Sequence, residues 1–423
     1  MGLDPVHFEG ITRHARRIGS TIDEQDQRAF AETVWREFLD PLRDDSGEPL
    51  LRPVDEQYCR EIDIEGAALE STPYEVVHGL DSGTINPTSF KNGLVLDVAQ
   101  AAMAVVPSDL DTHRYRTLVT AVHTDDASAV VDRDEQFDEG YVESQLLRAP
   151  AVSRFEESVV HELALYLAES THALSHFERV EDLFVLDGPI YPKGMLNWAD
   201  RDPELEGLLH EERGPRDVVK NYLRLVERAI ATDRPLIGFV KNPATKALTR
   251  TLRTRTDTPW VDDTAFFRRI LEQVSYDRTV DVNGTPQIKR RRETDSLTYT
   301  NWFRSRGGAD GLIVDAPFGI DRKASPEAYE VTFFALYDPR DDLLYRVEAP
   351  YGIVRDDDRR ERITQWVLQA VAAERGPPAP IAKADELARI DRSSTAALRQ
   401  ALAEGLGTEQ ARRYDDLRWN AHE

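Results

Sequence analysis

The sequence predicts an α/β protein with a mixed β-sheet that helices cover on both faces. Short apolar segments typical of strands recur from residue 75 onward. The two mid-chain strands, DLFVLDGP (182–189) and RPLIGFVKNP (234–243), each follow a long helical segment, and this alternation is typical of sheets buried on both faces. The chain has 423 residues and no internal repeat or low-complexity linker, so we expect one elaborated domain rather than two.

We expect residues 1–71 to form a helical N-terminal extension. The apolar side chains Phe30, Val34, Trp35 and Phe38 recur at intervals of three and four, which places them on one side of a helix. Such a face is typical of a helix that packs against the rest of a domain.

Three apolar runs with turn signals follow, and they predict three strands of an early meander. These runs are EVVHGLD (75–81), GLVLDVAQAAMAVVP (93–107) and RTLVTAVHT (116–124). The acidic stretch 125–139 predicts a solvated loop.

Helical segments over roughly 153–178 and 216–233 precede the two mid-chain strands. TPWVDDTAFFRRILEQV (258–274) carries an N-cap signal before an amphipathic run. YEVTFFALYD (329–338) and LLYRVEAPYG (343–352) predict a late antiparallel pair joined at the turn DPRDD.

The charge balance is strongly acidic, with 53 basic against 77 acidic residues and a net charge of −24. Only eight of the basic residues are lysine, 45 are arginine, and the acids are spread along the whole chain. This composition favours a halophilic source with molar salt in the cytoplasm, where the Debye length is about 3 Å and carboxylates keep a surface hydrated. Net charge is therefore weak evidence against a nucleic-acid partner.

Several classes of protein and site are excluded by simple features. No apolar run approaches the roughly 20 residues of a membrane helix, and the amino terminus lacks an apolar stretch after a basic head. With Cys59 alone, neither an internal disulfide nor a cysteine-ligated zinc or iron–sulfur site is expected. No GxxxxGK[ST], GxGxxG, GxSxG or HExxH motif is present. We expect a cytoplasmic protein without membrane contact.

Two aspartates terminate predicted strands: Asp81 in VVHGLDSGT and Asp187 in LFVLDGPIYP. If the strands are neighbours, the carboxylates lie about 4.8 Å apart per strand step, close enough to share divalent ions. Gly83, behind Asp81, would let the backbone pass close to a ligand. The alternative is that aspartate before a turn is ordinary turn chemistry.

A two-metal site needs a third acidic ligand. The helix opening in SRFEESVVHELALYL offers Glu156, Glu157 and Glu162, and Glu157 shares a face with His161. Glutamates in a first helical turn are also favoured by the helix dipole alone, so a purely structural role stays open.

Three basic features stand out against the acidic background. Lys241 is the only lysine that ends an apolar strand, which suggests an ammonium directed at a phosphate or a carboxylate rather than a surface side chain. The clusters RTLRTR (250–255) and IKRRRE (288–293) suggest a track for a phosphodiester backbone, and the alternative is a pair of solvated faces.

Taken in order, these segments resemble the NurA nuclease family. The resemblance rests on a strand ending in DSG, a helix opening with R-x-x-E, a strand ending in DGP, a strand ending in lysine, then VDDTAFF and LYRVEAP, and it covers roughly residues 75–390. It implies a ribonuclease-H-like core over 72–390. A helical tail, 391–423, would follow the proline-broken segment RGPPAP.

The resemblance also implies a site and partners. Asp81, Glu157 and Asp187 would be ligands of two Mn²⁺ or Mg²⁺ ions, and Lys241 would be the cation near the scissile phosphate. The choice of Glu157 depends on Arg154 three residues before it, and Glu156 is an alternative. The family forms homodimers and digests DNA ends together with the hexameric ATPase HerA.

One segment departs from the family pattern. The family's late G-Y-P-x-x-L-x-x-A-H segment corresponds here to GPPAPIAKAD, with Pro377 at the tyrosine and Asp385 at the histidine. Aspartate can still bind a metal or orient a water molecule as an auxiliary ligand, whereas proline cannot replace a phenol.

The expected function is that of a metal-dependent DNA nuclease, acting on ends and on single strands in recombinational repair. The arginines Arg290, Arg291 and Arg292 are expected to contact DNA. A non-catalytic adaptor that binds DNA and the ATPase is the first alternative, and a ribonuclease-H-like enzyme acting on RNA is the second.

Overall fold

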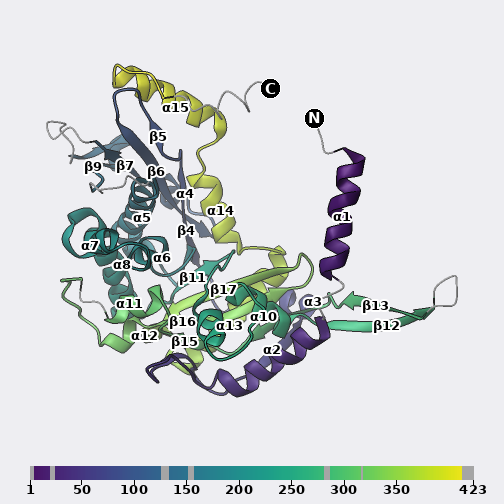
Figure 1. Cartoon of the computed structure of the whole chain (residues 1–423). Helices are drawn as coiled ribbons and strands as arrows, with labels where there is room; N and C mark the ends of the chain where they lie inside the picture. Colours follow the sequence, from purple (N-terminus) through teal and green to yellow (C-terminus); the bar gives the residue numbers. More distant parts are fainter. Residues whose placement is uncertain are drawn as a thin grey trace.

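The structure is a computed structural model that describes residues 4–19, 24–124, 133–150, 157–280, 286–315 and 318–411 (Figure 1). Within these ranges, one large mixed sheet forms the centre of the molecule. Its strands follow the order β1-β2-β15-β16-β17-β11-β10-β4-β6-β7-β9-β8, with β3, β5 and β14 paired beside this path and β12 and β13 forming a separate hairpin. The strands are β1 (Leu42–Arg43), β2 (Pro49–Pro53), β3 (Cys59–Asp63), β4 (Val77–Thr84), β5 (Thr88–Ser89), β6 (Val95–Val106), β7 (Arg116–His123), β8 (Arg133–Phe137), β9 (Val142–Arg148), β10 (Leu183–Asp187), β11 (Leu236–Val240), β12 (Val274–Val280), β13 (Pro286–Arg292), β14 (Ser296–Thr300), β15 (Phe303–Ser305), β16 (Val331–Asp338) and β17 (Leu343–Pro350).

Helices pack on both faces of this sheet. The α-helices are α1 (Pro5–Gly19), α2 (Glu24–Phe38), α3 (Ile64–Leu69), α4 (Leu110–Arg114), α5 (Glu157–His176), α6 (Lys193–Leu196), α7 (Pro203–Glu211), α8 (Arg213–Ala231), α9 (Ala247–Arg253), α10 (Asp263–Leu271), α11 (Ala309–Asp315), α12 (Tyr351–Val354), α13 (Asp357–Glu374), α14 (Ala379–Ala388) and α15 (Arg392–Gly405). Ser82 and Gly83 are consecutive on β4 and contact α5 and α14 respectively. Successive strand residues point to opposite faces, so these two helices cover opposite faces of the sheet.

The five central strands run in the order β7-β6-β4-β10-β11, and β6 is antiparallel to the other four. The predicted meander is the antiparallel set β4, β6 and β7. The predicted helix-to-strand alternation is α5-β10-α8-β11, in which β10 is parallel to both β4 and β11. The mixed α/β class and its ribonuclease-H-like arrangement are confirmed.

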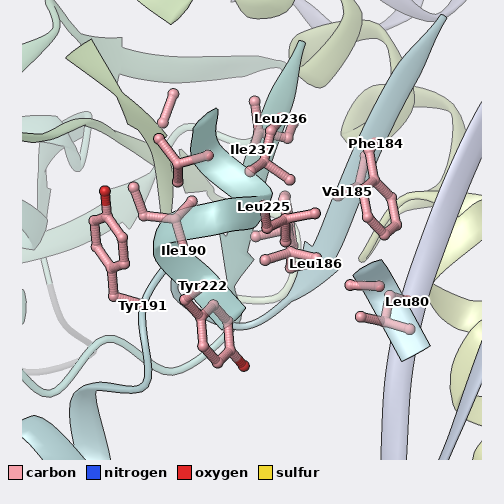
Figure 2. Close-up of a cluster of buried hydrophobic side chains, with 14 of the residues drawn as sticks. Leu80, Phe184, Val185, Leu186, Ile190, Tyr191, Tyr222, Leu225, Leu236 and Ile237 are labelled. Atoms are coloured by element: carbon pink, nitrogen blue, oxygen red, sulfur yellow. The ribbon is translucent and has the colours of Figure 1, made fainter. Parts of the chain in front are cut away.

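The hydrophobic core lies between this sheet and the helices α5 and α8. Figure 2 shows side chains of β10 and β11 packed with Tyr222 and Leu225 of α8. Phe184, Val185 and Ile237 are fully buried, because β10 and β11 are covered on both faces. Burying each such side chain contributes roughly 1.5–3 kcal/mol, so these short strands hold the centre of the sheet firmly.

A second hydrophobic cluster anchors the N-terminal helix α2 to the far half of the sheet. The predicted apolar face of α2 contributes Val34, which is fully buried, and Phe30, which stacks on Trp260 at 5.3 Å between ring centroids. Helix α10, capped by the carboxylate of Asp262 as the N-cap signal indicates, adds Phe266 to the same cluster.

The expectation of an all-helical extension over residues 1–71 is wrong for its second half. Strands β1, β2 and β3 lie there, and β2 and β3 join the main sheet by pairing with β15 and β14. These strands are short, and their partners lie near residue 300. Their local sequence therefore carries little of the signal that specifies them.

The acidic stretch 125–139 is also different from the expected loop in its second part. Residues 125–132 lie outside the described residues, but 133–137 form β8, an edge strand antiparallel to β9. All five residues of β8 are exposed, so no apolar alternation marks it as a strand.

Two elements stand away from the body of the molecule in Figure 1: the helix α1 and the β12–β13 hairpin. Helix α1 buries none of its side chains. Across the described ranges, none of the helices combines the length and the apolar character that crossing a bilayer requires.

Candidate active site

Asp81 and Asp187 lie side by side on neighbouring parallel strands. The register of β4 and β10 pairs Leu80 with Leu186, so the next residue on each strand is an aspartate, and the two carboxyl groups are hydrogen-bonded to each other. Asp187 ends β10 as predicted. Asp81 does not end its strand, because β4 continues to Thr84. The pairing depends on register rather than on two strand ends.

Burial and mutual repulsion make this pair resist full ionisation. Burial, followed by the charges of Asp187 and Glu169, raises the pKa of Asp81 to about 9. Burial also raises the pKa of Asp187, although Lys241 opposes this shift. Without a cation, the pair therefore retains a proton at neutral pH.

Lys241 follows directly after β11, and β11 is the neighbour of β10. Its Nζ donates a hydrogen bond of 2.5 Å to Oδ2 of Asp187, and the lysine side chain is one-third exposed. The ammonium group thus contacts the buried carboxylate, while part of the lysine side chain faces solvent.

Glu169 is the acidic residue that the structure adds to this pair. Its Oε1 accepts a 2.6 Å hydrogen bond from Ser82 Oγ, and its Oε2 accepts a 2.8 Å bond from the Tyr222 hydroxyl. Burial raises the pKa of Glu169 to about 7, even though both hydrogen bonds lower it. The helix α5 therefore contributes its carboxylate from the middle of the helix and not from its first turn.

The carboxylates predicted at the start of α5 lie elsewhere. Glu157 is the first residue of α5, twelve residues before Glu169, which is about 18 Å along the helix axis. Its alternative Glu156 and the preceding Arg154 lie outside the described residues. Glu162 accepts a 2.6 Å hydrogen bond from the Trp198 indole.

His161, on the face of Glu157, is committed to another contact. Its Nδ1 lies 2.8 Å from Oδ2 of Asp97, a fully buried residue of β6. The start of α5, with Glu157 and His161, thus lies near Asp97 of β6. Glu169, in the middle of the same helix, lies beside the aspartate pair.

Sequence reasoning passed over Glu169 because no motif marks it. The available signal was a carboxylate inside an apolar helical stretch: Tyr166 and Ala173 lie three residues before and four residues after it, and Leu167 and Ala168 are buried beside it. An acid among such neighbours indicates a buried functional group.

Asp385 approaches the pair from the opposite side on α14. Its negative charge raises the pKa of Asp187, and its own Oδ2 forms a 2.5 Å ion pair with Arg389. Two glycines of β4 allow this approach. A Cβ on Gly79 would lie 2.3 Å from the Pro380 carbonyl oxygen, and one on Gly83 would lie 2.5 Å from that of Ala388.

Gly83 therefore makes room for the backbone of a helix, where the sequence suggested room for a ligand. Pro377 precedes α14, within the turn that leads into the helix. The segment that carries both departures from the family pattern thus packs directly on the strand of Asp81.

The three arginines expected to contact DNA lie on β13 of the projecting hairpin (Figure 1). Arg290 and Arg292 both form ion pairs with Glu272, and Arg292 also lies 2.9 Å from Asp342. Arg291 is exposed. Two of the three guanidinium groups are thus partly neutralised by carboxylates of the same chain.

The other basic cluster, 250–255, divides into two kinds of residue. Arg253 donates to the Trp260 carbonyl at 2.6 Å, and Arg255 donates to the carbonyls of Arg43 and Asp44, so both hold loops together. Arg250 is exposed.

The donor set fits a hard divalent cation. In the part of the chain that the structure describes, no group of three or more His, Cys, Asp or Glu residues is already arranged as a metal site. Asp81, Asp187 and Glu169 nevertheless offer only oxygen donors, which Mn²⁺ and Mg²⁺ prefer. Burial, with smaller contributions from neighbouring carboxylates, raises the pKa values of all three groups, so a bound cation would favour their ionised forms.

Comparisons with known proteins identify a family for this chain. The family model described as the NurA domain matches residues 75–390, which is most of the chain. None of the curated protein sequences is significantly similar to it.

Three solved structures are similar in fold. The NurA nuclease from Sulfolobus solfataricus has 13% identity and a TM-score of 0.44, covering 93% of this chain and 97% of that one. A NurA with manganese has 11% identity and a TM-score of 0.39, covering 80% and 91%, and a NurA bound to dAMP and manganese has 11% and 0.39, covering 82% and 90%. On the extent of the domain match, the chain belongs to the NurA-domain family.

Proposed function

We propose that this protein is a divalent-metal-dependent deoxyribonuclease that hydrolyses phosphodiester bonds. The observation that carries the proposal is the hydrogen-bonded pair of Asp81 and Asp187 on neighbouring central strands, with Glu169 beside it. Membership of the NurA-domain family supports it.

We assign the ligand role to Asp81, Asp187 and Glu169, with Glu169 in place of Glu157. A bound Mn²⁺ or Mg²⁺ ion supplies Lewis-acid activation of water and neutralises charge on the phosphate, and the family resemblance favours two ions. Asp385 is the auxiliary carboxylate, because its charge already acts on Asp187.

The chain's own residues prepare the site in two ways. Asp81 and Asp187 would hold the cation as carboxylates, so the proton that the pair retains would have to leave for a cation to bind. Lys241, now held by Asp187 at 2.5 Å, can turn its ammonium towards a phosphate oxygen that enters beside that carboxylate. It would then offset the negative charge that develops during hydrolysis.

The biological role that we propose follows the family. The protein would digest DNA ends and single strands during end resection for recombinational repair, as a homodimer working with a HerA-type ATPase in a salt-rich cytoplasm. Membership of the NurA-domain family is what favours DNA as the substrate and a divalent ion as the cofactor, and one solved NurA is bound to dAMP and manganese.

The test is cleavage of labelled single- and double-stranded DNA with manganese, magnesium or chelator, in high salt. Asp81→Asn combined with Asp187→Asn should abolish metal-dependent degradation, because both replacements remove charged oxygen ligands. Full activity in this folded double variant would refute the assignment.

One observation favours a second candidate, a non-catalytic adaptor that binds DNA and the ATPase. Pro377 and Asp385 stand where the family pattern has tyrosine and histidine. Titration with manganese separates the two candidates: an adaptor without the metal site would show no saturable thermal stabilisation by the ion, whereas the nuclease would.

A further inference from the structure

A pocket of about 850 Å³ opens directly beside the carboxylate cluster. Pro189, two residues after Asp187, lines it, as does Val240, the residue before Lys241. Tyr166 lines it as well, one helical turn before Glu169. Three elements that position the site therefore also contribute to the pocket wall, so the pocket lies near the site.

Cations gather around this pocket. Arg201, Lys246 and Arg250 line it, and the side chain of Arg250 is 73% exposed, with its carboxylate neighbour Asp200 at 3.9 Å. Lys246 is exposed and has no ion-pair partner among the described residues. Neither Lys246 nor Arg250 is tightly neutralised by the chain itself.

The distribution of lysines reinforces this point. The chain has eight lysines against 45 arginines, yet Lys193 and Lys246 line the pocket, and Lys241 directly follows the lining residue Val240. A compact ammonium group suits a phosphate oxygen as a point-charge partner. Lysine is thus concentrated near this pocket, although arginine is the usual cation in the rest of the chain.

The charged residues at the pocket floor, Lys193, Arg346, Asp263, Asp310 and Glu348, leave no excess of positive charge. Lys193 lies 2.7 Å from Asp310 and 2.5 Å from Glu348, and Arg346 lies 2.8 Å from Asp310. Glu348 is fully buried. The positive charge that the pocket offers to a ligand therefore comes from Lys246 and Arg250, not from the floor.

We propose that this pocket receives the unpaired end of the substrate strand beside the scissile phosphate, with Lys246 and Arg250 contacting its phosphates. This inference rests on the proposed nuclease function. The volume lies within the roughly 300–1,000 Å³ of pockets that enclose small ligands, which suits a short unpaired end and excludes a duplex. Cations along a groove are the usual means of holding a single strand without sequence preference.

The test measures binding of a labelled single-stranded oligonucleotide by fluorescence anisotropy, in chelator, over a range of KCl concentrations. The variant is Lys246→Ala with Arg250→Ala. The matched control is Lys220→Ala with Arg213→Ala, two exposed cations of α8 that do not line the pocket. Lys246→Arg with Arg250→Lys keeps both charges and serves as the rescue.

The logarithm of the association constant falls linearly with log[salt], and each phosphate contact with a single strand contributes about 0.7 to the magnitude of that slope. The pocket variant loses two contacts, so the magnitude of its slope should be smaller by about 1.4. The control and the rescue should keep the wild-type slope. In manganese, the pocket variant should show a raised KM with kcat nearly unchanged. Thermal unfolding checks that all variants fold alike.

Different failures have different meanings. A pocket variant with the wild-type slope and KM, or a control that loses as much as the pocket variant, overturns the pocket inference while the nuclease function stands. A wild-type protein that neither binds nor cuts DNA overturns the proposed function, and the pocket inference falls with it.

Discussion

Asp81 and Asp187 cannot both ionise cheaply where they lie, because each is buried and each faces the other's charge. A retained proton relieves this conflict at neutral pH, and in the proposed nuclease a divalent cation would relieve it instead. The pH dependence of the stability should reveal this retained proton.

Asp81→Asn should stabilise the metal-free protein at alkaline pH. The pKa of Asp81 is raised from 3.8 to about 9 in the folded state, so its favourable contribution is complete below about pH 4 and is lost as the pH rises towards 9. Asparagine cannot ionise. In chelator at pH 8.5, the free energy of unfolding of the variant should exceed that of the wild type by about 1 kcal/mol or more. The variant should accordingly unfold at a higher temperature.

The same comparison at pH 5 is the control for this prediction. The gain should shrink there, because the unfolded carboxyl group is closer to its own pKa and the folded one remains protonated. A variant that is equally stable or less stable than the wild type at both pH values would contradict the raised pKa.

Glu169→Gln and Glu157→Gln should separate the two candidate ligands of α5. Glu169 lies against Ser82, next to Asp81, whereas Glu157 lies about 18 Å away along the helix. Glu169→Gln should lower manganese-dependent cleavage by at least the roughly 10- to 100-fold that loss of an outer-shell partner costs. Glu157→Gln should keep nearly full activity. The reverse pattern in a cleavage assay would restore Glu157 as the ligand.

The contact between β4 and α14 links the site to the C-terminal part of the fold. Helix α14 lies so close to β4 that the carbonyls of Pro380 and Ala388 occupy the space where side chains of Gly79 and Gly83 would be. This close packing brings Asp385 to the aspartate pair, although it lies some 300 residues from Asp81 in the chain.

Gly83→Ala should disturb that contact. The new Cβ would lie 2.5 Å from a backbone oxygen, which cannot move as a flexible side chain would, so overpacking should cost about 1–3 kcal/mol of unfolding free energy. Urea unfolding measures the loss, and manganese titration should show weaker stabilisation, because α14 carries Asp385.

Gly207→Ala is the matched control for this change. Gly207 lies inside helix α7, and a methyl group added there would meet nothing within 4 Å, so alanine should be neutral or stabilising by up to about 1 kcal/mol. Equal losses in the two variants would show that the close approach of α14 has no special importance.

The whole molecule carries a net charge of −24, and its self-repulsion opposes the compact state. The contacts that hold it together include many arginine–carboxylate pairs, but most of the excess charge is on the surface. Salt should therefore favour folding more than in a protein of balanced charge.

The unfolding temperature should rise as the KCl concentration rises from 0.1 to 2 M. The Debye length falls from about 10 Å to below about 3 Å over this range, which screens repulsion between surface carboxylates. An uncharged osmolyte at equal osmolality is the control, and it should give a smaller shift. An unfolding temperature that is insensitive to KCl would show that surface repulsion is unimportant for this fold.

The alternation α5-β10-α8-β11 and the antiparallel pair β16–β17 were predictable because hydrophobic periodicity and turn residues are local properties. Asp187 and Lys241 were found for the same reason, since each directly follows a run of apolar residues. The family resemblance rested on those same local segments, and the domain match confirms it.

The sequence by itself determined the α/β class, the central strands and the positions of Asp81 and Asp187 on two of those strands. Each of these depends on a pattern within ten or so residues. Only the tertiary structure decided that Glu169 lies beside the aspartate pair, that β2 and β3 join the sheet, and that Gly83 accommodates α14. Each of these depends on a partner far away in the chain, and a long-range contact leaves almost no trace in the local pattern of residues.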